Sequence, residues 1–514
     1  MEPGDTGCSE GTRRCGGLSV YACTGGEYVA VQTCAEACEN GTCVSACGGD
    51  PKSYLGCDFV ALDLDNTSIE FNGSSAAAQP WAVTVSNPGT APVTVEVRTV
   101  DDVLAGGPST IEPGAVTVFR MPRADIDGTG ISRNAFRIKT TGPVTAHQFN
   151  PENNVDVYSN DASLLLPERA LGNHYRVLGW PTEVQAIPIF GPRPLRSFVA
   201  IATVGRASAR VTLTAPARVA IAAGPGFDQL AAGETREVSL NAGEVLNLEP
   251  VDVDRADLTG MEITATVPIA VFAGSECADI PIGNVYCDHI EEQLTPVESW
   301  GDELVMGKFQ PRGREPDLYR VMAAQDGTVV TTTPPQAGAA STTLNAGQFV
   351  EFLSTEDFVV HASGPVLGAQ FMVGSGYPGP AEGCVRDDPN GDVSQCTILG
   401  DERCIGGSGL GDPASLLTVP SRQFRTDYIV LTPRAYFENY LTLIAPEGIQ
   451  VMLDGAPVPL GNPIPGEPWW VSRVPVTEGA HNLSATQPFG VYAYGYECDV
   501  SYAYSGGQNL DGAR

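Results

Sequence analysis

Apolar and polar residues alternate along four short segments, and each segment carries a proline at the same offset. The segments begin at Phe136 (FRIKTTGPV), Met261 (MEITATVPI), Phe358 (FVVHASGPV) and His481 (HNLSATQPF). Such alternation predicts a half-buried β-strand, and proline, which has no N–H to donate, is expected at a strand start or an edge. We therefore predict that the four prolines begin matching strands in four repeats of one unit. They are Pro143, Pro268, Pro365 and Pro488.

The surroundings of the four segments repeat as well. A hairpin candidate with a glycine in its turn precedes each segment, starting at Trp81, Phe198, Tyr319 and Tyr440. A second repeated motif follows three of them: DASLLLP at Asp161, CDHIEEQLTP at Cys287 and DPASLLTVP at Asp412. Short strands separated by Gly and Pro predict sandwiches or barrels. The predicted fold is all-β: a small disulfide-rich N-terminal module and four tandem β-sandwich-like units, with a closed β-propeller-like arrangement as the alternative.

The repeat positions divide the 514 residues into five parts. They are a disulfide-rich module (1–46), unit 1 (47–170), unit 2 (171–296), unit 3 (297–420, with a cysteine-containing insertion at 376–410) and unit 4 (421–514). This length suffices for several domains of ordinary size. The 58 glycines and 40 prolines favour strands and turns over helices.

Eight of the fourteen cysteines fall within the first 57 residues. They are Cys8, Cys15, Cys23, Cys34, Cys38, Cys43, Cys47 and Cys57; the other six are Cys277, Cys287, Cys384, Cys396, Cys404 and Cys498. The leading stretch has too few aliphatic residues to fold without covalent links. Zinc is the competing interpretation, but this stretch has no Cys-x-x-Cys pair and no histidine, so disulfides are favoured.

The spacing of the cysteines indicates two local disulfides, while the remaining connectivity stays open. We expect Cys47–Cys57 to fix the start of the first sandwich, and Cys277 and Cys287 are close enough for a second bond. An even, clustered set of cysteines predicts an oxidising compartment outside the cytoplasm.

The net charge of −32 and the pI near 4.4 disfavour nucleic acid and anionic lipid as partners. No apolar run is long enough to span a bilayer, and no signal-peptide core follows Met1. We therefore expect an extracellular or outer-surface protein whose signal or lipid-anchor segment is not part of this chain. The scarcity of lysine, with three among 29 basic residues, suggests a GC-rich bacterial genome.

Calcium is the one cofactor for which the sequence offers candidates. Asp388, Asn390 and Asp392 in RDDPNGD have the alternating oxygen spacing of a calcium loop, but they lack its later bidentate glutamate, so an acidic turn is the favoured interpretation. The same reservation applies to two other acidic runs. They are Asp125 with Asp127, and Asp252 with Asp254 and Asp257.

The known catalytic motifs are missing from the sequence. There is no G-x-S-x-G elbow, H-E-x-x-H site or Walker loop, and the five histidines are scattered. His147, directly after a repeat proline, is expected to be structural. Asp63 and Asp65 share one strand face, and a glycosidase could use such paired acids.

Three segments resemble the IgGFc-binding-protein N-terminal domain family. They are SYLGCDFVALDLDN from Ser53, VTAHQFNPENNVDVYSNDASLLLP from Val144, and the ending with GYE at Gly495, SY at Ser501 and GG at Gly506. Ser505 stands where the family pattern has a proline. The resemblance covers roughly residues 50–507 and implies an extracellular binding or structural role with no catalytic residues to transfer. Antibody Fc binding is not carried over, because a bacterial protein has no evident reason to meet an antibody.

The predicted function is therefore non-catalytic binding or adhesion to an extracellular protein or glycan. The alternatives are a carbohydrate hydrolase with acids in an inter-unit cleft, and a structural envelope or matrix component. Trp469 and Trp470 are adjacent in a predicted strand and should point to opposite faces. One of them is then a candidate ligand contact, with Tyr492 and Tyr494 extending the aromatic patch.

Overall fold

The computed structural model describes eleven stretches of the chain. They are residues 8–16, 19–33, 37–39 with 42–44 and 47, 53–69, 75–152, 159–187 with 191–284, and 286–377 with 409–510. Within these residues every regular element is a β-strand or a short 3-10 turn, so the fold is all-β. No helix in the described parts is long and apolar enough to cross a membrane.

Three of the four units are built around one long strand that belongs to two sheets in turn, and in unit 2 two consecutive strands, β21 (Glu262–Ala265) and β22 (Ile269–Ala278), take its place. In unit 1 this strand is β12 (Ala135–Asn150). Its first half pairs with β6 and β8, and its second half pairs with β7 and β13. The two halves thus form the centres of two four-stranded sheets, which pack face to face as a sandwich.

The same plan recurs three times. Unit 1 comprises β6 (Gly56–Leu62), β7 (Ala82–Ser86), β8 (Val93–Thr99), β9 (Leu104–Ile111), β10 (Val116–Arg120), β12 and β13 (Asp161–Leu165). Unit 2 comprises β14 (His174–Arg176), β17 (Ser197–Thr203), β18 (Ala209–Thr214), β19 (Thr235–Leu240), β20 (Val245–Leu248), β21 (Glu262–Ala265), β22 (Ile269–Ala278) and β23 (Asp288–Gln293), with a side hairpin of β15 (Glu183–Ile187) and β16 (Gly191–Leu195).

Units 3 and 4 follow the plan with a continuous long strand. Unit 3 comprises β24 (Gly301–Met306), β25 (Asp317–Ala323), β26 (Thr328–Thr333), β27 (Ser341–Leu344), β28 (Phe349–Ser354), β29 (Phe358–Phe371) and β30 (Ser415–Thr418). Unit 4 comprises β31 (Arg425–Thr432), β32 (Glu438–Pro446), β33 (Met452–Leu453), β34 (Ala456–Pro457), β35 (Asn462–Pro463), β36 (Trp469–Val476), β37 (Gly479–Glu497) and β38 (Val500–Ser505). The 3-10 turns are η2 (Ala76–Ala78), η3 (Glu168–Ala170), η4 (Val297–Ser299) and η6 (Ser421–Gln423).

The four repeat prolines occupy equivalent places, but the prediction that they begin strands is wrong. Pro143, Pro365 and Pro488 lie inside β12, β29 and β37, and Pro268 lies in the short gap between β21 and β22. Each marks the point where the long strand exchanges one set of partners for the other, and the β12 register shifts there, between Lys139 and Val144. A residue without an N–H costs no ladder hydrogen bond at such a point.

The predicted hairpins upstream of the prolines are also corrected. β7 and β8, for example, are consecutive strands, yet they do not pair with each other. β7 pairs with the second half of β12 and β8 pairs with the first half, in the opposite sheet. The connection is therefore an arch between the two sheets. Alternation and a turn glycine are the same in an arch and in a hairpin, so the local sequence does not distinguish them.

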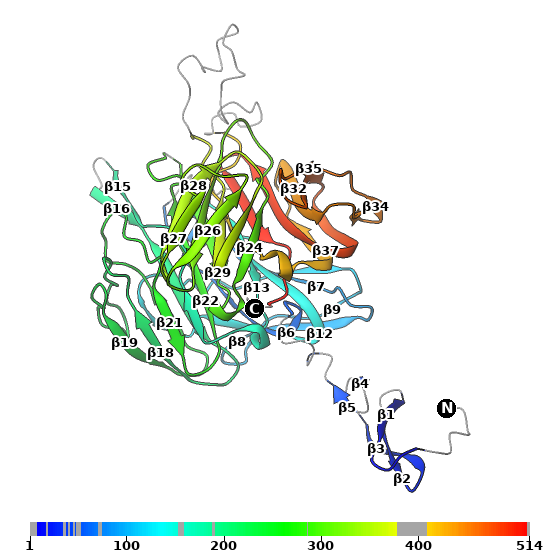
Figure 1. The fold of residues 1–514 in the computed structure, drawn as a ribbon. Helices are drawn as coiled ribbons and strands as arrows, with labels where there is room; N and C mark the ends of the chain where they lie inside the picture. The colour runs from blue at the N-terminus through cyan, green and yellow to red at the C-terminus, as the bar shows by residue number, and fades with distance from the viewer. Residues whose placement is uncertain are drawn as a thin grey trace.

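The four units close into a ring, the arrangement named as the alternative in the sequence analysis, although each unit is a two-sheet sandwich and not a single blade. Their last strands, β13, β23, β30 and β38, contact one another in cyclic order, β38 returning to β13. Hydrogen bonds from backbone N–H groups to side chains, and not backbone ladders, join these last strands to one another. The Ser163 hydroxyl accepts the Gln293 N–H at 2.8 Å, and Glu292 accepts the Leu417 N–H at 3.0 Å. Figure 1 shows the strands of the four units gathered around this centre.

Asp161, the first residue of β13, lies in the middle of the ring. Its carboxylate accepts backbone N–H groups from the other three units: Glu291 at 3.3 Å, Ser415 at 3.2 Å and Ala503 at 3.1 Å. The carboxyl is fully buried, and burial raises its pKa well above the usual value. One side chain therefore accepts hydrogen bonds from the backbones of three other units at the ring centre, where strands of different units do not pair with one another.

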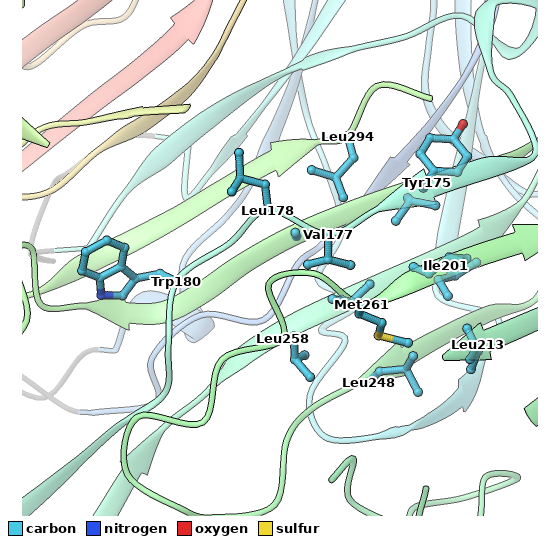
Figure 2. Close-up of a cluster of buried hydrophobic side chains, with 14 of the residues drawn as sticks. Tyr175, Val177, Leu178, Trp180, Ile201, Leu213, Leu248, Leu258, Met261 and Leu294 are labelled. Carbon is cyan, nitrogen blue, oxygen red and sulfur yellow. The ribbon is translucent and has the colours of Figure 1, made fainter. Parts of the chain in front are cut away.

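Apolar clusters fill the seams between neighbouring units. The cluster drawn in Figure 2 belongs mainly to unit 2, with Trp180 and Met261 among its members, and it extends into unit 3 through Phe371. Phe198 and Phe272 of unit 2 join the unit 1 core. Separate clusters join unit 3 to unit 4 and unit 4 to unit 1. Each unit thus buries apolar surface against two neighbours, which stabilises the closed ring.

The two ends of the ring meet at the seam of units 1 and 4. Ser53 forms an isolated β-bridge with Asn509, and the Tyr54 N–H donates to the Gln508 carbonyl at 3.3 Å. The leading segment, with β1 (Arg13–Gly16), β2 (Ser19–Thr24), β3 (Glu27–Thr33), β4 (Ala37–Glu39) and β5 (Thr42–Val44), lies outside the four units (Figure 1).

Within the described residues, disulfides join Cys8 to Cys23, Cys47 to Cys57 and Cys277 to Cys287. The last two are the local bonds that the spacing predicted. Cys498 is also disulfide-bonded, and none of the described cysteines is free.

Candidate binding surfaces

The tryptophan pair lies at the start of β36. Trp470 is opposite Ala445 and Trp469 is opposite Pro446 in the pairing with β32. Trp469 packs edge-on against Phe424, with ring centroids 5.6 Å apart. Both indoles are half-buried. Trp469 therefore has a packing role in the seam of units 3 and 4, and ligand contact by either ring stays a hypothesis.

The two tyrosines do not extend an exposed aromatic patch. Tyr492 and Tyr494 are 1% and 0% exposed. The Tyr492 hydroxyl accepts the Val419 N–H at 2.9 Å, and the Tyr494 hydroxyl accepts the Gln310 N–H at 2.8 Å. Both rings lie on the half of β37 that faces the core, and each hydroxyl satisfies a backbone group of unit 3. Their sequence position near the chain end gave no sign of this burial.

The first calcium candidates, Asp388, Asn390 and Asp392, lie outside the described residues, as do Cys34, Cys384, Cys396 and Cys404. Among the other acidic candidates, Asp252 forms an ion pair with Arg196 at 2.8 Å. Asp257 forms one with Arg320 at 3.2 Å. These carboxylates are held by arginines, which is the ordinary structural role of an acidic loop.

His147 has the structural role expected of it. The side chain is buried in β12, and its ring lies against Tyr504 of unit 4 with centroids 4.6 Å apart. Burial lowers the pKa of His147 to about 3, so the imidazole is neutral at physiological pH. It therefore fills the seam of units 1 and 4 as an apolar ring does.

Beyond His147 and Phe149, the seam of units 1 and 4 opens into a groove of about 680 Å³. One wall is the outer face of β7 and β10; the other is formed by the end of β31 and the start of β37. The lining residues are Ala82, Thr84, Val116, Val118, Arg120, Phe149, Glu152, Leu431, Thr432, Pro433, Arg434, Glu478, Gly479 and Ala480. We call this the 1–4 groove.

Strand register explains why the floor of the 1–4 groove is apolar. Val118 pairs with Thr84 and Arg120 pairs with Ala82, so alternate residues of both strands point into the groove. Val118 is 44% exposed there. β10 is an edge strand. The face of β7 and β10 that points into the groove is therefore not covered by a second sheet in the described part of the chain.

Charged pairs border this apolar floor. Arg120 donates to Glu152 at 2.5 Å, and Arg434 lies 3.9 Å from Glu478. Both arginines are largely exposed. An apolar centre with a charged, wet rim is the arrangement typical of protein–protein contact sites. No local sequence pattern indicates this groove, because its walls come from segments about 300 residues apart and become one surface only when the ring closes.

The model of a family described as IgGFc binding protein matches residues 161–495. The human protein named IgGFc-binding protein is 27% identical over 268 residues, which is 52% of this chain and 4% of that protein. This chain thus spans a small part of the length of that curated relative.

Two solved structures each align over 88% of this chain. A biofilm associated protein BSP domain has a TM-score of 0.15 at 7% identity, with 95% of its length covered. A tetra-tandem repeat from the extending region of a large adhesion protein has a TM-score of 0.09 at 10% identity, with 99% covered. Both scores lie far below the level that indicates a common fold.

Proposed function

Because the chain belongs to the IgGFc binding protein family, we propose that it is a non-catalytic extracellular protein that binds another extracellular protein. The 1–4 groove is the proposed contact site. Disulfides in the leading segment, unit 1 and unit 2 support an oxidising compartment.

The observation that carries this proposal is the composition of the 1–4 groove. Its volume of about 680 Å³ lies within the range of small binding pockets. Its floor includes several aliphatic side chains, and one of them, Val118, is exposed. An apolar side chain of a partner would bury its surface there, while the rim arginines and glutamates would meet polar groups around it.

The same composition favours a protein partner over a glycan. A sugar carries many hydroxyl groups, and each needs a hydrogen-bond partner when it leaves water. The hydroxyl-bearing residues of the lining, Thr84 and Thr432, are buried, and so is Phe149, its one aromatic residue. A glycan would lose more hydration at this floor than it regains in contacts.

The closed ring supports binding by a preorganised surface. The groove walls belong to two units that are fixed by the apolar cluster of Phe149, Tyr502 and Tyr504. Rigid walls reduce the entropy cost of association. The carboxylates at the ring centre are engaged with backbone N–H groups, as Asp161 illustrates, so they support the fold and not a hydrolytic site.

Binding by the purified chain to arrays of extracellular proteins and of glycans tests the proposal, with human Fc fragments as one protein probe. For any protein that binds, Val118→Glu should weaken affinity at least about tenfold, because a charge would enter the apolar floor. Val329→Glu is the matched control, since Val329 is a 39% exposed strand residue of unit 3, outside the groove.

Both variants should keep the wild-type melting temperature, because both valines are solvent-accessible. Equal loss of binding in the two variants, or no loss in either, would contradict the groove assignment. Binding confined to glycans would contradict the choice of partner, and turnover of a glycan probe would contradict the non-catalytic role.

A further inference from the structure

Three carboxylates from distant parts of the sequence converge at the seam of units 1 and 2. Asp65 follows β6, Asp127 lies in the loop between β10 and β11 (Gly130–Ser132), and Glu249 follows β20 of unit 2. One carboxylate oxygen from each lies within 4.8 Å of the others. Like charges at this separation repel unless a proton or a cation lies among them.

Well-defined backbone contacts place the two unit 1 carboxylates together. The Asp63 carboxylate accepts the Ala124 N–H at 2.7 Å, and the Asp63 carbonyl accepts the Ile126 N–H at 3.0 Å. The loop that carries Asp127 is therefore fastened to the segment that carries Asp65. The convergence is built into the fold of unit 1.

The same loop then fixes Glu249. Thr129 accepts the Glu249 N–H at 2.9 Å through its hydroxyl, and the next three residues form β11, which joins the unit 2 sheet beside β20. The Asn247 amide donates both to the Gly128 carbonyl at 3.1 Å and to the Glu249 carboxylate at 3.2 Å. The loop of unit 1 thus becomes an edge of unit 2, with the carboxylates where the two units join.

Asp65 provides an independent indication of a ligand. Its side chain is about 95% buried, and its Oδ2 atom has no hydrogen-bond partner among the described residues. It faces Glu249, another buried carboxylate, and a hydrogen bond between the two carboxyl groups requires a proton on one of them. Two ionised carboxylates cannot donate to each other, so an unpartnered buried oxygen here costs free energy unless something else binds it.

A cavity of about 220 Å³ leads from Asp65 to solvent. Asp127, at its outer side, is exposed, so an ion can reach the buried oxygen. The other charged lining residues are Arg123, Asp125, Arg193, Arg196 and Glu276. Arg196 lies 3.5 Å from Glu249 and 3.8 Å from Glu276, and Arg123 pairs with Asp125. The positive charges of these arginines do not neutralise the cluster, so Asp65, Asp127 and Glu249 together keep a net negative charge.

We propose that Asp65, Asp127 and Glu249 bind one calcium ion, which joins unit 1 to unit 2. A donor set made only of carboxylate oxygens suits a hard cation and not zinc. Oxygens that lie within 4.8 Å of one another fit around an ion whose bonds to oxygen are about 2.3–2.6 Å long. Water would complete the coordination from the open side of the cavity.

The test is calcium titration of the metal-free full-length chain at fixed pH, followed by calorimetry and thermal melting. One calcium ion should bind with a Kd of about 0.1–1 mM, as in extracellular modules, and should raise the melting temperature. Magnesium at the same concentration should do so less, because it requires shorter bonds and gives up water reluctantly.

Asp127→Asn removes one proposed ligand without changing a buried group, and it should weaken calcium binding about tenfold or more. Asp228→Asn makes the same charge change at an exposed residue of unit 2 that is not one of the three clustered carboxylates and should leave binding unchanged. Asp65→Asn should abolish the calcium-induced rise in melting temperature.

Asp65→Asn also separates the two explanations of the cluster. If a shared proton holds Asp65 and Glu249 together, the asparagine amide can donate in its place, and the wild-type protein will be indifferent to calcium. That result would overturn the proposal, and so would calcium binding that Asp127→Asn and Asp65→Asn leave intact.

Discussion

The carboxylate of Asp161 accepts the backbone N–H of Ala503 at 3.1 Å, across 342 residues of sequence. The same carboxylate bonds to Glu291 and Ser415, so Asp161→Ala would leave three buried N–H groups without an acceptor. We expect a loss of about 3 kcal/mol or more in the free energy of unfolding.

Urea denaturation of the purified variant measures this loss. Asp161→Asn, which keeps one acceptor oxygen, should cost less than alanine, and Asp228→Ala on the surface should cost almost nothing. If Asp161→Ala unfolds at the wild-type urea concentration, the carboxylate is not a structural centre of the ring.

Stability should fall as pH rises from about 6.5 to 8. Burial raises the pKa of Asp412 to about 7, and nearby Asp499 adds to the effect. At the start of this window the folded chain still carries a proton on Asp412 that the unfolded chain has already lost, because an ordinary aspartate has its pKa near 4, and the folded chain gives this proton up as the pH passes 7. Raising the pH therefore favours the unfolded chain.

The buried histidines act in the opposite direction only at lower pH. Burial lowers the pKa of His147 and of His289 to about 3. Their contribution to the stability of the folded chain is therefore fully present above pH 6.5 and is lost as the pH falls below that value. Asp412→Asn should reduce the fall between pH 6.5 and 8 by about 1 kcal/mol, as measured by urea midpoints at several pH values. An unchanged slope in this variant would show that Asp412 titrates normally.

Trp469→Ala should destabilise the protein more than Trp470→Ala. Trp469 packs on Phe424 and on the seam between units 3 and 4, so its loss leaves a cavity there. Since the ring is half-buried, we expect about 2–3 kcal/mol, less than for a fully buried tryptophan. Thermal melting of both variants measures the difference. Equal melting temperatures would leave no packing role for Trp469, and a binding loss in Trp470→Ala alone would support its role as a ligand contact.

Removal of the Cys277–Cys287 disulfide should destabilise unit 2. The bond joins the end of β22 to the segment before β23 and closes a loop with a sequence separation of 10. The double variant Cys277→Ser/Cys287→Ser should lose about 2–3 kcal/mol, because its unfolded chain is less restricted. Adding reductant should destabilise the wild type further than this variant; if the variant and the wild type melt together without reductant, the bond contributes nothing.

The sequence predicted the repeated unit but not how the repeats assemble. Alternation around Pro143 and Pro365 identifies the long strand because period and proline are local properties. Whether β7 pairs with β8 depends on which half of β12 each strand meets, and that is decided by packing. The start of β13 at Asp161 was visible as one echo of a repeated motif. Its role as a buried acceptor was not, because a carboxylate in a loop and a carboxylate in a ring centre have the same local sequence.

The candidate surfaces depend even more on assembly. Val118 and Leu431 become the walls of one groove only when unit 4 reaches unit 1. Asp65 and Asp127 lie on neighbouring segments of unit 1, but their third partner, Glu249, comes from unit 2. The buried positions of Tyr492 and Tyr494 likewise follow from contacts with unit 3. Charge and spacing along the chain identified acids and aromatics as candidates without showing which of them meet.

The meeting of Ser53 and Asn509 also determines how the ring responds to tension. When the chain is pulled through these two residues, the load falls on the contact between the first and the fourth unit, because this contact lies directly between the points of attachment. The other three contacts between units bear little force until the contact of units 1 and 4 opens. The 1–4 contact should therefore determine the mechanical resistance of the ring. A ligand that binds both walls of the 1–4 groove would raise the force needed to open the ring.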